Sequence, residues 1–345
     1  LMARSLGTNN LPDCSNMCHE SSGVALTQTI GVGKGTVSLE DIRDHADLIV
    51  IMGQNPGTNH PRMLTSLEAL KKRGGRIVAI NPLPEAGLMR FKNPQRPSGV
   101  VGGGTALSDV YLPVRVNGDL ALLLEVNRRL VQRGAVDHSF IEAFTDGFQA
   151  AAQHWSSVDP VAVSGLTGLT SEQIEQFVDE VAGADRVIVC WAMGLTQHRN
   201  SVATIREVVN LLLLGGNIGR PGAGACPVRG HSNVQGDRTM GIYEKPTEAF
   251  LTRLDEAMGI TSSRAPGLDV VDTITAMQRG RVGVFMTLGG NFASATPDTE
   301  ATEIALGQVG LTVHVSTKLN RSHAVPGVES LILPSLGRSD TDVQA

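Results

Sequence analysis

Cys18 and His19 stand side by side in a polar, turn-rich run that spans residues 9–23 and leads into an expected helix. A cysteine thiolate is both a nucleophile and a soft metal ligand. An imidazole exchanges a proton near neutral pH. The pair therefore suits a metal ligand with its proton acceptor, a nucleophile with its base, or two ordinary buried residues.

The other cysteines argue against a structural zinc site. Cys14 precedes Cys18 by a short spacing, but a zinc site of this kind needs a second pair of ligands. Cys190 and Cys226 each stand alone in the sequence. A cysteine-nucleophile hydrolase remains an alternative, although beyond Asp13 and backbone amides the chain offers no acid to orient the histidine and no oxyanion loop.

Arg229 is a further candidate for chemistry, in the glycine-rich run of residues 227–236. Its guanidinium can fork onto a carboxylate. A second glycine-rich run, residues 215–224, lies just upstream. Two flexible, donor-rich segments, the second of which carries Arg229, favour an anionic, oxygen-rich ligand over a solvated surface loop.

The elements that position these groups follow an α/β pattern. Residues 47–52 predict a strand, residues 53–60 a loop, residues 61–72 a helix and residues 76–80 a second strand. This is a βαβ unit with a ligand-sized loop after its first strand. Further strands are expected at residues 111–116 and 186–191, and helices at 119–133 and 171–182.

A weak internal repeat predicts a second half of the same kind. Residues 282–288 and 311–315 read as strands around a helix at 298–306. The sequence Met-Gly-Gln-Asn at 52–55 recurs as Leu-Gly-Gly-Asn at 288–291. Chance recurrence of a common turn is the alternative. Otherwise the repeat predicts two nucleotide-like ligands, one on each half.

The run Gly-Val-Gly-Lys-Gly at residues 31–35 looks like a dinucleotide-binding fingerprint. Such a fingerprint needs a strand entering its turn, whereas residues 23–30 have a helical pattern. A glycine loop at a helix C-terminus is therefore the better interpretation. A simple nicotinamide-dependent dehydrogenase is correspondingly disfavoured.

Composition sets the class of protein. The 345 residues, 41% of them apolar, can bury a large core, and 39 glycines against two Trp and two Tyr favour a cofactor-binding α/β protein. The net charge of −5 without a basic stripe argues against nucleic acid as a partner. No apolar run approaches a membrane span. Because Leu1 is not an initiator, we expect an internal piece of a longer, cytoplasmic protein.

The order of motifs resembles that of molybdopterin-dependent oxidoreductases, most closely the formate dehydrogenase alpha-subunit-like branch. The motifs are Cys-His at 18–19, Gly-x-Asn-Pro at 53–56, Met-Gly-x-x-Gln at 193–197, Gly-Asn-Ile-Gly-Arg-Pro-Gly-x-Gly at 216–224 and Pro-Val-Arg-Gly-x-x-Asn-Val-Gln-Gly at 227–236. Each motif alone is weak. Their combined order is specific and spans essentially the whole chain.

The resemblance implies two doubly wound, Rossmann-like α/β domains with mostly parallel sheets. Residues 1–225 would carry the Cys-His pair and one molybdopterin guanine dinucleotide, and residues 226–345 would form part of a second domain with the other. These two dinucleotides (bis-MGD) would hold a molybdenum or tungsten ion. Related enzymes often add an upstream 4Fe-4S cluster, for which this chain has no motif, and a downstream β-rich domain.

The resemblance also assigns roles to residues. Cys18 would be the metal ligand, His19 the proton acceptor and Arg229 the cation that orients a small anionic substrate such as formate. An electron-carrier protein or redox subunit would be the partner. The implied cofactor-binding residues are Gly53, Asn55, Thr58, Asn81, Met193, Gly194, Gln197, Gly230, His231, Asn291, Thr317, Asn320 and Arg321.

Two departures from the family pattern leave alternatives open. Glu20 replaces the small residue that often follows Cys-His in formate dehydrogenases, and His231 stands where related enzymes often have glutamine. One alternative keeps the cofactor but reduces an oxyanion or an N-oxide. Another is a cofactor-binding, stress-related protein without robust catalysis. As a fragment, the chain is expected to bind cofactor poorly.

Overall fold

The computed structural model describes residues 1–231, 234–337 and 339–343, and the chain divides into two compact units. We call Cys18–Ser232 the Cys18 unit, and Leu1–Met17 with Asn233–Ala345 the C-terminal unit. The division differs from the expected boundary at residue 225, because the first residues pack with the end of the chain. The Asn9 side-chain amide donates to the carbonyls of Ser263 and Ala265 at 2.8 and 2.9 Å.

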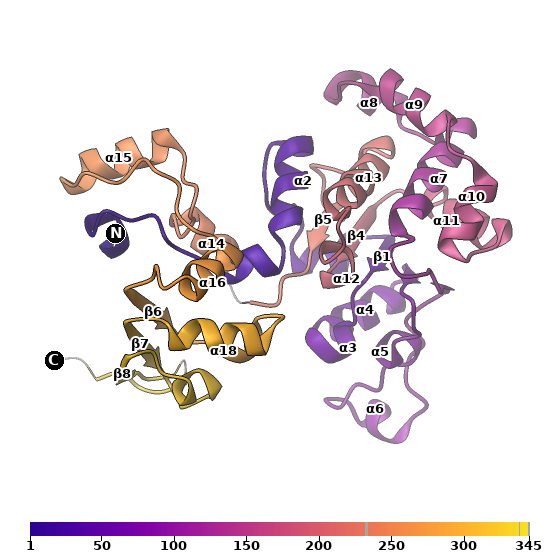
Figure 1. The fold of residues 1–345 in the computed structure, drawn as a ribbon. Helices are drawn as coiled ribbons and strands as arrows, with labels where there is room; N and C mark the ends of the chain where they lie inside the picture. The colour runs from indigo at the N-terminus through magenta and orange to yellow at the C-terminus, as the bar shows by residue number, and fades with distance from the viewer. Residues whose placement is uncertain (232–233, 338, 344–345) are drawn as a thin grey trace. The chain divides into compact units, whose positions relative to one another are not determined.

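The Cys18 unit contains a five-stranded sheet. Helices connect its strands and lie around them (Figure 1). The strands are β1 (Leu48–Met52), β2 (Arg76–Ile80), β3 (Val110–Leu112), β4 (Val187–Trp191) and β5 (Gly224–Pro227). The helices are α2 (Glu20–Ile30), η2 (Asp41–His45), α3 (Pro56–Asn59), α4 (Met63–Lys72), α5 (Ala86–Met89), α6 (Pro97–Val101), α7 (Asp119–Gln132), α8 (His138–Phe144), α9 (Phe148–Ser156), α10 (Pro160–Thr167), α11 (Ser171–Ala182), α12 (Met193–Thr196) and α13 (Ser201–Leu214).

The strands of this unit form one parallel sheet in the order β3-β2-β1-β4-β5. Every residue of β1 and β4 is buried, as expected for parallel strands covered on both faces. Leu48, Val50 and Met52 pack with α2, α7, α11 and α13, whereas Ile49 and Ile51 pack with η2 and α4. Helices therefore cover both faces, which confirms the doubly wound fold predicted here.

Local signals end several elements where the sequence indicated. Helix α2 stops at Gly31, which takes a left-handed φ of 73°, so the glycine run is a helix C-terminus as predicted. Helix α11 opens with the capping box of Thr170 and Gln173. Strand β3 is shorter than expected, because Pro113 has no N–H to continue the ladder after Leu112.

The C-terminal unit holds a three-stranded parallel sheet in the order β6-β7-β8. Its strands are β6 (Val284–Leu288), β7 (Leu311–Ser316) and β8 (Glu329–Pro334). Its helices are α1 (Met2–Ser5), η1 (Cys14–Met17), α14 (Val234–Thr239), α15 (Glu248–Met258), α16 (Val270–Gln278), α17 (Phe292–Ala295), α18 (Thr299–Gly307) and η3 (Arg321–Ala324). Phe285 of β6 packs with α16 and α18 in a core of their own.

The predicted repeat is visible in the backbone. Strands β1 and β6 each end in a glycine with left-handed φ, 55° at Gly53 and 69° at Gly289. An asparagine two residues later, Asn55 or Asn291, stands at the N-cap of a four-residue helix. A longer helix and a parallel neighbouring strand follow in both units. In the part of the chain that the structure describes, no helix is both long and apolar enough to cross a bilayer.

Candidate functional site

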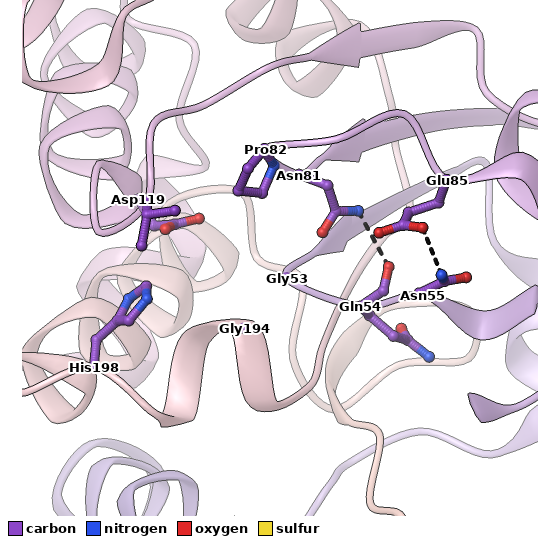
Figure 2. Close-up of a pocket in the computed structure, with 10 residues that line it drawn as sticks. Gly53, Gln54, Asn55, Asn81, Pro82, Glu85, Asp119, Gly194 and His198 are labelled. Carbon is purple, nitrogen blue, oxygen red and sulfur yellow. Dashed lines mark hydrogen bonds between the residues drawn. The ribbon is translucent and has the colours of Figure 1, made fainter. Parts of the chain in front are cut away.

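A pocket of about 220 Å³ lies at the carboxyl ends of β1, β2 and β4 (Figure 2). The chain runs outward from β1 to β3 on one side of the sheet and returns to β4 and β5 on the other. Ligands of open α/β sheets bind at such a switch point. The lining residues are Gly53, Gln54, Asn55, Asn81, Pro82, Glu85, Val116, Asp119, Gly194 and His198.

Two glycines bring the loops after β1 and β4 together at this pocket. The Gly194 N–H donates to the Gly53 carbonyl at 3.0 Å, and the Gly53 N–H donates to the Ile80 carbonyl at 3.1 Å. A Cβ on Gly194 would lie 2.5 Å from the Gly53 Cα, and a Cβ on Gly53 would lie 2.8 Å from the Gly194 Cα. Only glycine fits at either position. Both were predicted from sequence as binding residues, and both line the pocket.

Amide side chains shape the opposite wall. The Asn81 side chain donates to the Gln54 carbonyl at 3.1 Å, and the Asn55 side chain donates to the Glu85 carboxylate (Figure 2). The Thr58 N–H donates to the Asn55 side-chain oxygen at 3.3 Å, so Thr58 orients the Asn55 side chain. The Gln54 side-chain oxygen is buried without a partner in the described residues. The Gln54 side chain points away from Asp119 and His198 (Figure 2), and its amide N–H donates to the Met63 sulfur at 3.4 Å.

Asp119 and His198 face this wall and were not predicted as site residues. Asp119 begins α7 and is only 5% exposed, and burial raises the pKa of its carboxyl to about 6. The His198 Nδ1 is buried and unpartnered in the described part of the chain. From the sequence, Asp119 was predicted only as the first residue of a helix. Asp119 follows the third strand, but only the strand order of the folded sheet places it at the edge where ligands bind.

A second group of predicted residues surrounds Cys18. The half-buried thiol receives a backbone hydrogen bond from Gly230 and lies near the Arg229 charge, and both lower its pKa. Burial has the larger effect, so the pKa of the thiol is raised overall. The Thr196 hydroxyl donates to the Cys18 carbonyl at 2.6 Å, which ties Cys18 to α12. The structure thus brings Cys18, Arg229 and Gly230 into one site.

His19 is buried beside this thiol, with 1% of its surface exposed. Its Nδ1 lies 2.9 Å from the Ser22 hydroxyl, which accepts from the Trp191 indole N–H at 2.9 Å. Because the indole only donates, the Ser22 proton is available to the imidazole. Burial, together with the Arg229 charge and a smaller effect of His60, lowers the pKa of His19 to about 4, against an opposing Val228 backbone hydrogen bond. The ring is therefore neutral at pH 7.

Backbone contacts orient the arginine. The Arg229 guanidinium donates to the Gly33 carbonyl at 3.3 Å, and the Arg229 carbonyl lies 3.1 Å from the His60 Nε2. The glycine loop of residues 31–35 was predicted as a helix end without a ligand role. It contributes to the site through this carbonyl.

Other predicted residues of this unit lie at the surface. Met193 begins α12 and is 47% exposed, and Gln197 ends the same helix in an exposed position. Gly230 and His231 are exposed in the loop after β5. The next two residues of that motif, 232 and 233, lie outside the described residues. Glu20 is the first residue of α2, where a carboxylate is favoured by the helix dipole.

In the C-terminal unit, the loops after β6 and β7 meet through two asparagines. The Asn320 side chain donates to the Gly290 carbonyl at 2.7 Å, and the Ser322 hydroxyl lies 3.2 Å from the Asn291 side-chain oxygen. Thr317 follows β7 directly and is exposed. Arg321 forms an ion pair with Glu303. The predicted residues of this half therefore share one end of its sheet.

These features define an α/β protein with a pocket at its sheet switch point and a cysteine-arginine site in the same unit. Over residues 1–324 the sequence matches the family model described as molybdopterin oxidoreductase. The chain belongs to the molybdopterin oxidoreductase family, as its motif order indicated.

The individual relatives differ in how similar they are to this chain and in what their names say. A protein of Mycobacterium bovis, named as an uncharacterized oxidoreductase, is 57% identical over 350 residues, covering 100% of this chain and 45% of the relative. The Bacillus subtilis protein named "Putative formate dehydrogenase YrhE" is 28% identical over 97% of this chain and 33% of its own length. The chain thus spans less than half the length of these relatives.

The fold has a solved counterpart. Acetylene hydratase from Pelobacter acetylenicus superposes with a TM-score of 0.67 at 18% identity, covering 91% of this chain and 44% of the hydratase. At this identity the likeness establishes the fold. It supports the predicted α/β class with parallel sheets.

Proposed function

We propose that this chain forms part of a molybdenum or tungsten bis-MGD oxidoreductase that removes two electrons from a small anionic substrate, as a formate dehydrogenase does. The observation that carries the proposal is the meeting of the Cys18 thiol with Arg229 and Gly230. A soft thiolate donor suits such a metal, and a guanidinium beside it suits a carboxylate substrate. The name of the Bacillus subtilis relative agrees with this substrate class.

The switch-point pocket fits one end of the cofactor, the guanine nucleotide. Its volume of about 220 Å³ suits a base rather than a whole dinucleotide. The Asp119 carboxylate can accept hydrogen bonds from N1–H and the exocyclic amine of guanine, a pair that adenine lacks. The His198 Nδ1, which has no partner in the described residues, offers a further contact. Asn291, Thr317, Asn320 and Arg321 are proposed for the second nucleotide.

When bound, the cofactor would supply the two-electron chemistry at its metal. Cys18 would hold that metal, with the Gly230 N–H stabilising the thiolate. Arg229 would fix the negative end of the substrate, its guanidinium aimed by the Gly33 carbonyl. His19 is the proposed proton acceptor, and its ring is neutral at pH 7, with Nδ1 beside the Ser22 hydroxyl.

The negative charge of Glu20 is weaker evidence against formate as the substrate than the sequence suggested. As the first residue of α2 it has a structural role at the helix N-terminus, which accounts for an acid at this position. Reduction of an oxyanion or N-oxide uses the same arginine and remains the alternative. A fold shared with a hydratase also means that the fold alone does not select the reaction.

The test replaces Cys18 with alanine in the full-length protein and measures metal content and dye-linked formate oxidation. We expect loss of both bound metal and turnover. Cys14→Ala is the matched control, because Cys14 is another half-buried cysteine near the same helix. Undiminished formate oxidation by Cys18→Ala would exclude the proposed role. Metal retention with no formate activity in the parent, but reduction of an N-oxide, would favour the alternative.

A further inference from the structure

Two histidines of the C-terminal unit lie together, next to the loop that carries Asn320 and Arg321. His314 is on β7 and His323 is on η3, and their ring centroids are 4.8 Å apart. His314 is 2% exposed. The Nε2 atoms of both rings are buried and have no hydrogen-bond partner in the described residues. Ser316, on the same face of β7 and 7% exposed, has a hydroxyl in the same condition.

The other nitrogen of each ring has an oxygen beside it. The His314 Nδ1 lies 3.0 Å from the Thr287 hydroxyl, which can itself donate to the Val313 carbonyl at 3.4 Å. The His323 Nδ1 lies 3.1 Å from the Asn320 side-chain oxygen. Metal-binding histidines commonly donate Nδ1–H to such an oxygen, which leaves the Nε2 lone pair for the metal. Thr287 thus provides the expected outer contact for His314. For His323, the Asn320 side-chain oxygen would provide it only after the Asn320 backbone N–H, which donates to the His323 Nδ1 at 3.0 Å, is displaced.

We propose that His314 and His323 bind one divalent transition-metal ion through their Nε2 atoms. Imidazole ligands suit Zn²⁺, Cu²⁺ and Ni²⁺, and Zn²⁺ is the probe chosen here. The Ser316 hydroxyl and water complete the coordination. No group of three or more His, Cys, Asp or Glu side chains suited to a metal occurs in the described residues, so moderate rather than tight binding is expected.

Burial prepares the site for a cation that accepts lone pairs. Desolvation, together with the neighbouring His323, lowers the pKa of His314. The Asn320 backbone N–H also lies 3.0 Å from the His323 Nδ1. In the metal-bound form this contact would give way to Nδ1–H donation to Asn320. Binding would then link β7 to the loop that carries Thr317 and Arg321.

The first experiment is a Zn²⁺ titration of the purified chain, followed by calorimetry and by nitrogen-15 NMR of the imidazoles. We expect one ion whose binding shifts the Nε2 resonances of His314 and His323 and sets both rings to the Nδ1–H tautomer. Unchanged Nε2 resonances for this pair at saturating Zn²⁺ would overturn the proposal. This measurement needs no substitution, so it decides the question even where a variant fails to fold.

Variants separate the ligands from their outer contacts. His323→Gln should abolish this ion, whereas His138→Gln, at an exposed histidine of the other unit, should retain it. Thr287→Val should weaken Zn²⁺ binding by ~10–100-fold, and Thr287→Ser, which keeps the oxygen, should restore it. Equal affinity in all four variants would refute the assignment. Cys18→Ala should leave this ion in place, which separates the inference from the proposed function.

Discussion

Asp119 offers the sharpest test of how the switch-point pocket works. Its carboxyl is almost fully buried, and burial raises its pKa from 3.8 to about 6. The native protein therefore holds this proton more tightly than the unfolded chain does. Stability contributed by the group is greatest below about pH 4 and falls as the pH rises to about 6. Above that pH the full cost of an ionised, buried carboxylate remains.

The size of this effect follows from the shift. A difference of roughly two pKa units corresponds to about 3 kcal/mol. Asp119→Asn carries no charge, so its free energy of unfolding should exceed that of the parent by about 3 kcal/mol at pH 8. Roughly half of the difference should already be present at pH 5, because the unfolded carboxyl ionises first.

Urea denaturation of both proteins from pH 5 to pH 8 measures this difference. Asp146→Asn, which removes the same charge from an exposed position, provides the matched control. A difference between Asp119→Asn and the control that stays constant from pH 5 to pH 8 would refute the assigned cause. If Asp119→Asn were less stable than the parent at pH 8, the predicted sign of the effect would be wrong.

The same substitution tests the proposed use of the pocket. An asparagine amide cannot accept both guanine hydrogen bonds, so we expect Asp119→Asn to bind guanosine monophosphate ~10–100-fold more weakly. Xanthosine monophosphate presents an oxygen in place of the guanine amine and should gain affinity in the variant. A gain in stability without any change in nucleotide binding would leave the electrostatic reasoning intact and exclude guanine recognition by Asp119.

Three further substitutions test the packing and the arginine site. Gly194→Ala should cost ~1–3 kcal/mol in urea unfolding, because its Cβ would lie 2.5 Å from the facing glycine Cα. Gly165→Ala in α10, where a Cβ meets nothing within 4 Å, should instead be neutral or stabilising, and equal losses would contradict the argument. Ser22→Ala should lower the free energy of unfolding by ~1–3 kcal/mol, because it leaves the buried nitrogens of the Trp191 indole and the His19 imidazole unpaired. A change below roughly 0.5 kcal/mol, the scatter for surface substitutions, would contradict this prediction. Arg229→Lys in the full-length protein should raise KM for formate about 10-fold or more by losing the forked contact, whereas an unchanged KM would place the substrate elsewhere.

The fold was predictable where local chemistry and periodicity agree. The apolar strands around residues 48–52 and 76–80, the capping box at Thr170 and the stop at Gly31 all depend on near neighbours in the sequence. The helices between residues 138 and 167 were missed because their short patterns resemble loops. Strand β8 is exposed along its whole length and lacks the alternation that marks a half-buried strand.

The site residues also divide into those predicted from the sequence and those that were missed. Gly53 and Gly194 were predicted from motifs, and the structure adds the physical reason, which is their mutual contact across the sheet. Asp119 was missed because its meaning depends on strand order, which one sequence does not provide. The His314 and His323 pair was missed because a stretch of loop and helix separates two rings that only the fold brings together.

The glycine run at residues 31–35 is not a dinucleotide-binding fingerprint, yet it contributes to the arginine site. No strand enters it, so its N–H groups do not form a phosphate cradle. A Cβ on Gly33 would lie 2.8 Å from the Thr27 hydroxyl and 3.0 Å from the Gly23 carbonyl, which restricts this position to glycine. That close approach fixes the Gly33 carbonyl that accepts from Arg229. The same small residue that suggests a nucleotide loop in the sequence therefore acts through its acceptor oxygen, by aiming the cation proposed to hold the substrate.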